Sequence, residues 1–161
     1  MWEKEYKKKV IEPKELEKKI KALKKEQKSI VTLNGSFDLL HAGHLKIIYE
    51  ASTLADVLIV ALNSDLSIKE YKSPYRPIIT LEYRMQMISA LFFVDYVTYF
   101  NEVNPIKVLE IIKPNIHVNG SEYGENCIEK NIVEKNGGII HIVNKKPSLS
   151  TTNIIEKIKC E

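Results

Sequence analysis

Apolar and polar positions follow two different periods along this chain. Five short apolar runs rich in β-branched residues are typical of buried strands, and they lie at residues 30–34, 56–62, 94–100, 115–119 and 139–143. Between them, apolar positions recur every three to four residues. This spacing predicts helices over residues 13–27, 44–54, 80–91, 105–112, 127–135 and from 150 onward.

Strands that alternate with helices indicate a parallel sheet with right-handed crossovers. We therefore predict an α/β fold: a Rossmann-like, doubly wound five-stranded parallel sheet with helices on both faces, preceded by an N-terminal amphipathic helix. Residues 66–79 are the least regular part, because Pro74 and Pro77 preclude a continuous helix there. We expect a cation-bearing loop at the carboxyl end of the second strand, where open α/β sheets bind ligands.

The size and composition favour a single domain. The chain has 161 residues and 44% apolar residues, but no apolar run near the roughly 20 residues that a membrane span needs. The N-terminus lacks a signal-peptide core, so we expect a cytoplasmic protein. Cys127 and Cys160 are far apart and are interpreted as unpaired thiols.

The net charge of +3 is unevenly distributed. Residues 1–28 hold eleven Lys and six Glu, a net +5, and the remainder carries −2. Lys and Glu are interleaved without an aromatic platform, which favours a solvated helix face over a nucleic-acid site. We predict that residues 1–28 form a basic amphipathic helix packed on a domain of residues 29–161.

The segment Asn34-Gly35-Ser36-Phe37-Asp38-Leu39-Leu40-His41-Ala42-Gly43-His44 joins the first strand to the next helix. A glycine and a serine just past the strand let the backbone approach an anion, and the helix presents unpaired N–H groups and a positive dipole end. His41 and His44 flank Gly43, and imidazoles can donate to phosphate oxygens. We interpret the segment as a polyphosphate site. A zinc site is not favoured, because no third ligand stands at suitable spacing.

Three further polar groups follow strands or begin helices. Hydroxyl and N–H groups at residues 150–152 would form a second anion site, although a capping cluster alone would look the same. Four cations could clamp phosphates, namely Lys69, Lys72, Arg76 and Arg84. Residues 119–123 suit a base or ribose pocket, or a simple turn.

These residues resemble the HxGH nucleotidylyltransferases, whose signature His41-Ala42-Gly43-His44 matches after Gly35-Ser36-Phe37-Asp38. Such enzymes move a nucleoside monophosphate from a triphosphate onto a phosphate or carboxylate and release pyrophosphate. Over about residues 10–160 the layout is similar to the adenylyltransferases of ADP-heptose synthesis, a carbohydrate pathway toward lipopolysaccharide. The resemblance implies that ATP and D-glycero-β-D-manno-heptose 1-phosphate give ADP-heptose and pyrophosphate.

The resemblance also implies roles for individual residues. It makes His41, His44 and Lys72 catalytic. It assigns nucleotide or phosphate binding to Asn34, Gly35, Ser36, Phe37, Gly43, Asp65, Arg84, Asn119, Gly120, Ser150, Thr151 and Thr152. It assigns acceptor binding to Lys69, Arg76, Glu122 and Tyr123. We expect Mg²⁺ to accompany the triphosphate without a protein metal site, a homodimer, and neither nucleic acid nor membrane as a partner.

One departure leaves alternatives open. The resembling enzymes commonly read Lys-Gly-Gly-Asp-Tyr after the fourth strand, where this chain has Asn119-Gly120-Ser121-Glu122-Tyr123. A CTP-dependent cytidylyltransferase acting on glycerol 3-phosphate or a related phosphorylated polyol is the second interpretation, because that family shares the first motif and a similar Ser-Thr-Thr. A catalytically silent nucleotide-binding module is a more distant third.

Overall fold

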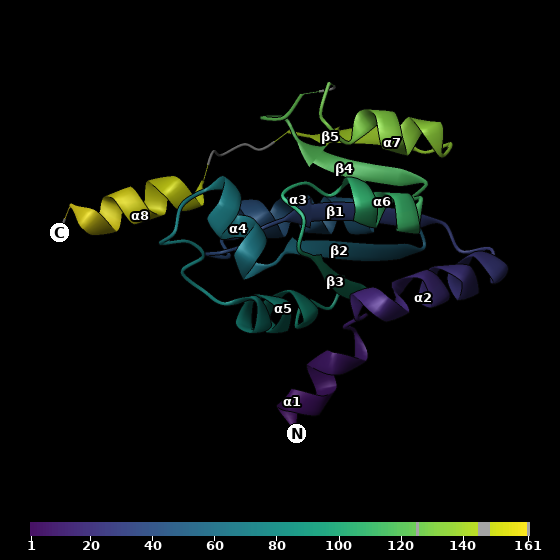
Figure 1. The fold of residues 1–161 in the computed structure, drawn as a ribbon, viewed down its shortest axis with the longest axis horizontal. Coiled ribbons are helices and arrows are strands. Elements are labelled where there is room, and N and C mark those ends of the chain that lie inside the picture. The colour runs from purple at the N-terminus through teal and green to yellow at the C-terminus, as the bar shows by residue number, and fades with distance from the viewer. Residues whose placement is uncertain (125, 145–148, 161) are drawn as a thin grey trace.

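An open sheet of five parallel strands forms the centre of the molecule. The computed structural model describes residues 1–124, 126–144 and 149–160. Its strands are β1 (Ile30–Gly35), β2 (Val57–Asn63), β3 (Tyr96–Phe100), β4 (Ile116–Gly120) and β5 (Ile139–Val143). They lie side by side in the order β3-β2-β1-β4-β5 (Figure 1). The predicted Rossmann-like fold is confirmed, and the winding reverses between β1 and β4.

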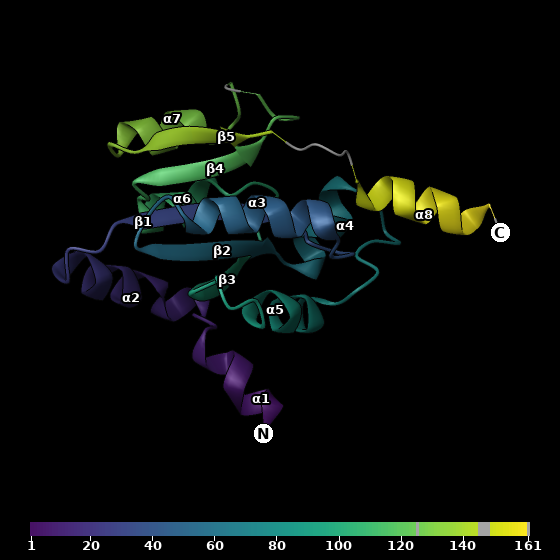
Figure 2. The same ribbon diagram turned by 180° about the vertical axis from the view of Figure 1, so that it is seen from behind.

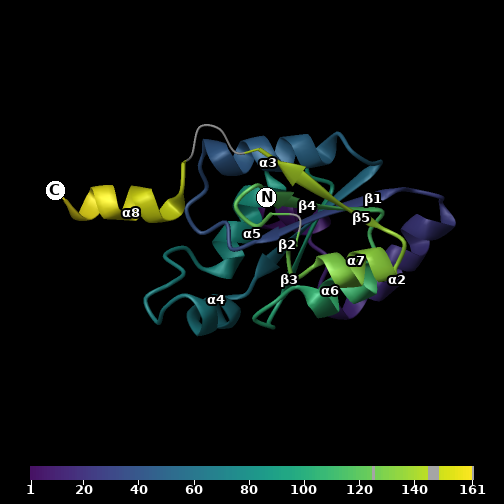
Figure 3. The same ribbon diagram turned by 90° about the horizontal axis from the view of Figure 1, so that it is seen from above.

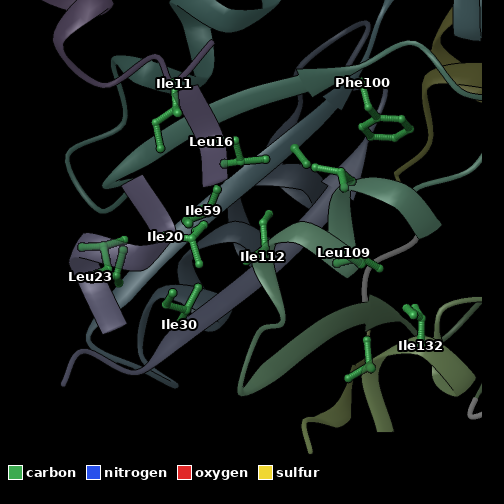
Figure 4. Close-up of a cluster of buried hydrophobic side chains, with 14 residues drawn as sticks. Ile11, Leu16, Ile20, Leu23, Ile30, Ile59, Phe100, Leu109, Ile112 and Ile132 are labelled. Atoms are coloured by element: carbon green, nitrogen blue, oxygen red, sulfur yellow. The ribbon is translucent and has the colours of Figure 1, made fainter. Parts of the chain in front are cut away.

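Helices cover both faces of this sheet. One apolar cluster joins the strands to α2 (Pro13–Lys25), α6 (Ile106–Ile112) and α7 (Lys130–Lys135), as the close-up in Figure 4 shows. A second cluster joins the other face to α3 (Ala42–Ser52) and α5 (Leu81–Ser89). Seen from above in Figure 3, α3 lies on one side of the sheet and α6 and α7 lie on the other. The two clusters arise because successive side chains of a strand point to opposite faces.

Two predicted helices and one predicted loop differ from the structure. Helix α3 begins at Ala42, before the predicted start at residue 44, because His41 occupies its N-cap and accepts a hydrogen bond from the Gly43 N–H. The segment 66–79 is not irregular throughout, since it contains most of helix α4 (Asp65–Tyr71). The Ser64 hydroxyl caps α4 by accepting from the Ser67 N–H at 3.2 Å. Helix α7 is shorter than the predicted 127–135.

The N-terminal segment contains more than the predicted amphipathic helix. It begins with α1 (Trp2–Glu5) and a 3-10 helix, η1 (Tyr6–Lys8). Val10 then forms a parallel bridge with Val97, and the Ile11 N–H donates to the Val97 carbonyl at 2.8 Å. The segment therefore covers the outer edge of β3, which would otherwise expose unpaired backbone groups.

The last helix, α8 (Thr151–Lys159), extends away from the sheet at the end of the molecule where the strands finish (Figure 2). None of its described residues is buried. Among the described helices of the whole chain, none has the length and apolar character needed to cross a membrane.

Candidate active site

A cavity of about 630 Å³ opens at the carboxyl ends of β1 and β4, beside the point where the winding reverses. It collects fourteen of the residues predicted from the sequence. The β1 end contributes Asn34, Gly35, Ser36 and Phe37, and helix α3 contributes His41 and His44. The β4 end contributes Asn119, Gly120, Glu122 and Tyr123; Lys72 and the α8 start complete the set with Ser150, Thr151 and Thr152.

The loop after β1 has a backbone shape that its residues enforce. Phe37 is buried and adopts a left-handed conformation, with φ of 47°. Its ring lies so close to Gly35 that a β-carbon there would approach within 3.1 Å. Phe37 also meets the His44 ring edge-on, with centroids 5.3 Å apart. A buried aromatic ring therefore turns the loop toward the first turn of α3, which explains the Gly and Phe of the motif.

The two histidines of the motif lie face to face. Their ring centroids are 3.8 Å apart with an interplanar angle of 20°. His41 Nδ1 accepts from the Gly43 N–H at 3.1 Å, so the neutral ring carries its proton on Nε2, where it can act as a donor. A β-carbon at Gly43 would come within 3.0 Å of the His41 ring. Gly43 does not line the cavity itself; its role is to make room for His41.

Lys72 extends from the end of α4 over the loop after β1. It occupies the C-cap of α4, and its Nζ donates to the Ser36 hydroxyl at 3.0 Å. The pKa of Lys72 is lowered mainly by partial burial of the amine and, to a smaller extent, by repulsion from Arg76. Attraction to Asp38 opposes this effect. The Lys72 ammonium group therefore lies beside the loop backbone that the motif offers to an anion.

A fully buried carboxylate, Asp38, ties this loop to residues 76–79. It accepts from Arg76 Nε at 2.5 Å and from the N–H groups of Ile78 and Ile79 at 3.0 and 2.8 Å. Burial alone would raise the pKa of Asp38, but the three hydrogen bonds outweigh burial and hold that pKa below its usual range. Arg76 was predicted to bind the acceptor, yet its side chain is only 14% exposed and does not line the cavity.

Arg84 is completely buried beneath the same loop. Its guanidinium donates to the carbonyls of Ser36, Asn63 and Ile79 at 2.6, 2.9 and 2.9 Å. Its remaining contact is Asp65 Oδ1 at 2.7 Å, and that oxygen also accepts from the Leu81 N–H. Neither Arg84 nor Asp65 lines the cavity, so their predicted nucleotide binding stays a prediction, while the structure shows Arg84 bonded to protein groups. Lys69 is exposed on α4 and likewise lies outside the cavity lining.

The end of β4 forms the opposite wall of the cavity. Asn119 is 4% exposed, and its Nδ2 donates to Glu129 at 3.3 Å. A β-carbon at Gly120 would overlap the Glu122 carboxylate, which would have to move aside. The Ser121 N–H donates to the Val143 carbonyl at 2.9 Å and fixes the turn that presents Glu122.

Helix α8 brings a second helix N-terminus to the cavity. The Ser150 hydroxyl accepts from the Asn153 N–H at 3.1 Å. A β-carbon at Gly43 would lie 3.4 Å from the Leu149 carbonyl, so the starts of α3 and α8 are close neighbours. Two positive helix ends therefore face one cavity, which favours a ligand with several negative charges.

Sequence reasoning did not identify every residue around the cavity. Leu33, Ile47, Leu149 and Asn153 also line it, as does Ser121 within the predicted segment 119–123. The sequence pattern placed the apolar Ile47 in a helix. That Ile47 lines the cavity, however, depends on how α3 packs against β1. Within the described part of the chain, no three His, Cys, Asp or Glu residues are grouped so that they could hold a metal ion.

Comparisons with known proteins agree with this geometry. A family model described as cytidylyltransferase-like matches residues 32–157. The bifunctional protein HldE of Syntrophotalea carbinolica is 42% identical over 132 residues, covering 81% of this chain and 27% of that protein. HldE of Campylobacter jejuni subsp. doylei is 40% identical over 153 residues, covering 90% of this chain and 32% of that protein. The chain therefore spans less than a third of the length of these curated relatives.

Two solved structures share the fold. The lipopolysaccharide core biosynthesis protein from Thermoplasma volcanium superposes with a TM-score of 0.61 at 27% identity, covering 76% of this chain and 99% of that one. Pantoate-beta-alanine ligase from Francisella tularensis superposes with a TM-score of 0.61 at 17% identity, covering 93% of this chain and 76% of that one. At this low identity the likeness supports the fold alone. Because the family match takes in most of the chain and its HxGH motif, the chain belongs to the cytidylyltransferase-like family.

Proposed function

We propose that this chain transfers AMP from ATP to D-glycero-β-D-manno-heptose 1-phosphate, giving ADP-heptose and pyrophosphate. The observation that carries the chemistry is the gathering of His41, His44, Lys72 and two helix N-termini around one cavity. The choice of substrate is supported by the motif layout, by the HldE relatives and by the likeness to a lipopolysaccharide core biosynthesis protein.

The proposed reaction needs charge stabilisation more than proton transfer. An oxygen of the acceptor phosphate is already anionic, and it attacks the α-phosphorus in line while the bond to the bridging oxygen breaks and pyrophosphate leaves with the electron pair. His41 Nε2–H, His44 and Lys72 would donate to phosphate oxygens, and the starts of α3 and α8 would hold the rest of the polyphosphate. We expect Mg²⁺ to arrive bound to the phosphate oxygens and to neutralise part of their charge.

A matrix of donors and acceptors tests this proposal. ATP, CTP, GTP and UTP are each paired with heptose 1-phosphate and glycerol 3-phosphate, and pyrophosphate release is measured. We expect ATP with heptose 1-phosphate to give the highest kcat/KM. A maximum for CTP with glycerol 3-phosphate would favour the second interpretation, which the altered residues 119–123 keep open. No release from any pair would support a silent nucleotide-binding module. The expected homodimer stays a prediction for sedimentation equilibrium.

A further inference from the structure

Glu129 is a buried carboxylate that the proposed mechanism does not use. It stands just before α7, is 6% exposed, and forms no ion pair with any residue that the structure describes. Its side chain accepts from Asn119 Nδ2 at 3.3 Å. The Cys127 side chain also hydrogen-bonds to Glu129, but no cation that the structure describes pairs with it, so its presence beside the cavity calls for a reason other than packing.

The contact with Glu129 determines which way the Asn119 amide faces. A carboxylate only accepts hydrogen bonds, so the NH₂ group of Asn119 must be the part that faces Glu129. The amide oxygen is then the acceptor that Asn119 can offer to the cavity it lines. This orientation follows from the chemistry of the pair, even though the oxygen and nitrogen of an amide have nearly the same shape.

A second amide oxygen lies on the adjacent strand. Leu33 pairs with Val118, so the next residues along, Asn34 and Asn119, are neighbours at the ends of β1 and β4. Asn34 also lines the cavity, and its Oδ1 is buried without a hydrogen-bond partner among the described residues. This wall of the cavity therefore offers acceptors to a ligand that brings donors.

The charges divide the cavity into two ends. His41, His44, Lys72 and the starts of α3 and α8 suit phosphates. The wall at Asn34 and Asn119 carries oxygen acceptors, and the carboxylate of Glu129 lies behind Asn119, so this end of the cavity disfavours phosphates. The uncharged base of the nucleotide is the part of the ligand that fits this wall.

We propose that Glu129 is a positioning residue that fixes the Asn119 amide and makes the enzyme prefer triphosphates whose base carries an amine at purine C6 or pyrimidine C4. Adenine and cytosine present an NH₂ donor, whereas guanine and uracil present a carbonyl oxygen at the corresponding position, which would meet the Asn119 oxygen without a hydrogen bond. This inference rests on the proposed nucleotidyl transfer. It adds which feature of the triphosphate's base Glu129 selects. A site built for a donor rejects an analogue that lacks it, because buried acceptors stay unpaired.

Glu129→Gln tests the inference with almost no change in shape. Glutamine can donate to the Asn119 oxygen as well as accept from its nitrogen, so the Asn119 amide can adopt both orientations. We expect the kcat/KM ratios of ATP to GTP and of CTP to UTP to fall by roughly tenfold, the scale of one polar contact. Calorimetry then gives the dissociation constant of each triphosphate. The ratios of these constants report on base recognition without turnover.

Two further variants complete the experiment. Glu134→Gln removes the same charge from an exposed position on α7, and its base preference should match the unmodified protein. Asn119→Ser removes the amide and should reduce the preference even if Glu129→Gln does not fold. A base preference that survives in folded Glu129→Gln or in Asn119→Ser would overturn the inference, as would an equal loss for all four triphosphates. Base-selective binding without pyrophosphate release would instead uphold the inference and contradict the proposed function.

Discussion

Single residues of the motif have separable tasks, and His41 shows this most clearly. Its Nδ1 caps α3 by accepting from the Gly43 N–H, while the proposed mechanism uses the opposite ring nitrogen, Nε2, as a donor. His44 sits inside the first turn of α3 against Phe37 and has no capping task. The two functions of His41 can therefore be separated by substitution.

His41→Asn keeps an N-cap acceptor but removes the imidazole donor. We expect this variant and His44→Ala each to lower kcat by about 100-fold or more, the usual effect of losing a group that stabilises transition-state charge. Thermal melts should show that both variants fold. His141→Ala, on β5 and outside the cavity lining, is the control. Unchanged turnover in either variant would remove that histidine from the mechanism.

Lys72 is expected to act mainly in the transition state. Because its amine can move from the Ser36 hydroxyl to a phosphate, Lys72→Ala should reduce kcat more than it raises KM for the triphosphate. Lys69→Ala, on the preceding turn and outside the cavity lining, should change neither. An increase in KM alone would make Lys72 a ground-state binding residue.

His117 gives the fold a pH dependence that is independent of the active site. It is fully buried on β4, its Nδ1 lies 2.7 Å from the Thr32 hydroxyl, and burial lowers the pKa of His117 to about 3. In the unfolded chain the His117 imidazole binds a proton near pH 6.5, whereas in the folded chain it stays neutral. The free energy of unfolding therefore falls as the pH drops below that value. From pH 7 to pH 5 the loss should be about 2 kcal/mol.

Urea unfolding at both pH values measures this loss. His117→Asn keeps a polar partner for Thr32 but does not titrate, so its stability should depend less on pH by about the same 2 kcal/mol. An identical pH slope in the variant and the unmodified protein would show that other groups cause the acid sensitivity.

At the scale of elements, one buried arginine joins four segments. Arg84 comes from α5 and binds the loop after β1, the end of β2, the start of α4 and the residue before α5's N-cap. Thr80 occupies that N-cap, but its side chain makes no capping hydrogen bond; Asp65 accepts from the Leu81 N–H instead. The loop after β1 therefore depends on α5, although no residue of α5 lines the cavity.

Arg84→Lys keeps the charge but cannot reach all four acceptors. We expect it to lower the free energy of unfolding by about 3–5 kcal/mol, because buried carbonyls and a carboxylate lose their partner. Tyr83→Ala, at the exposed neighbouring position, should stay within about 0.5 kcal/mol. Denaturant titrations compare the two. Equal stability of both variants would contradict a structural role for Arg84.

At the scale of the whole molecule, the N-terminal segment is part of the core. Leu16, Ile20 and Leu23 of α2 belong to the same buried cluster as β1, β2 and α6, as Figure 4 shows. The basic residues of α2 face outward while its apolar stripe completes one face of the sheet. We therefore expect the segment 1–28 to unfold together with the rest of the chain.

Leu16→Ala checks this expectation. The side chain is 1% exposed, so its removal should cost about 2–5 kcal/mol of stability. Lys18→Ala, exposed on the same helix, serves as the control. If circular dichroism shows α2 melting separately, or if both variants unfold alike, the segment is only an attachment to the domain.

The sequence by itself determined the order and kind of most elements and the place of the phosphate motif. This was possible because apolar periodicity and glycine positions act over a few neighbouring residues. Helix α4 was not predicted, because seven residues capped by Ser64 carry little periodic signal. Only the tertiary structure decided that Arg84 and Asp38 support the loop after β1 from within and that Glu129 reaches Asn119. The contacts of Arg84 and Asp38 with other segments join residues far apart in the chain, and Glu129 meets Asn119 only across the turn after β4, so these polar atoms find partners only once the sheet has brought the loops together.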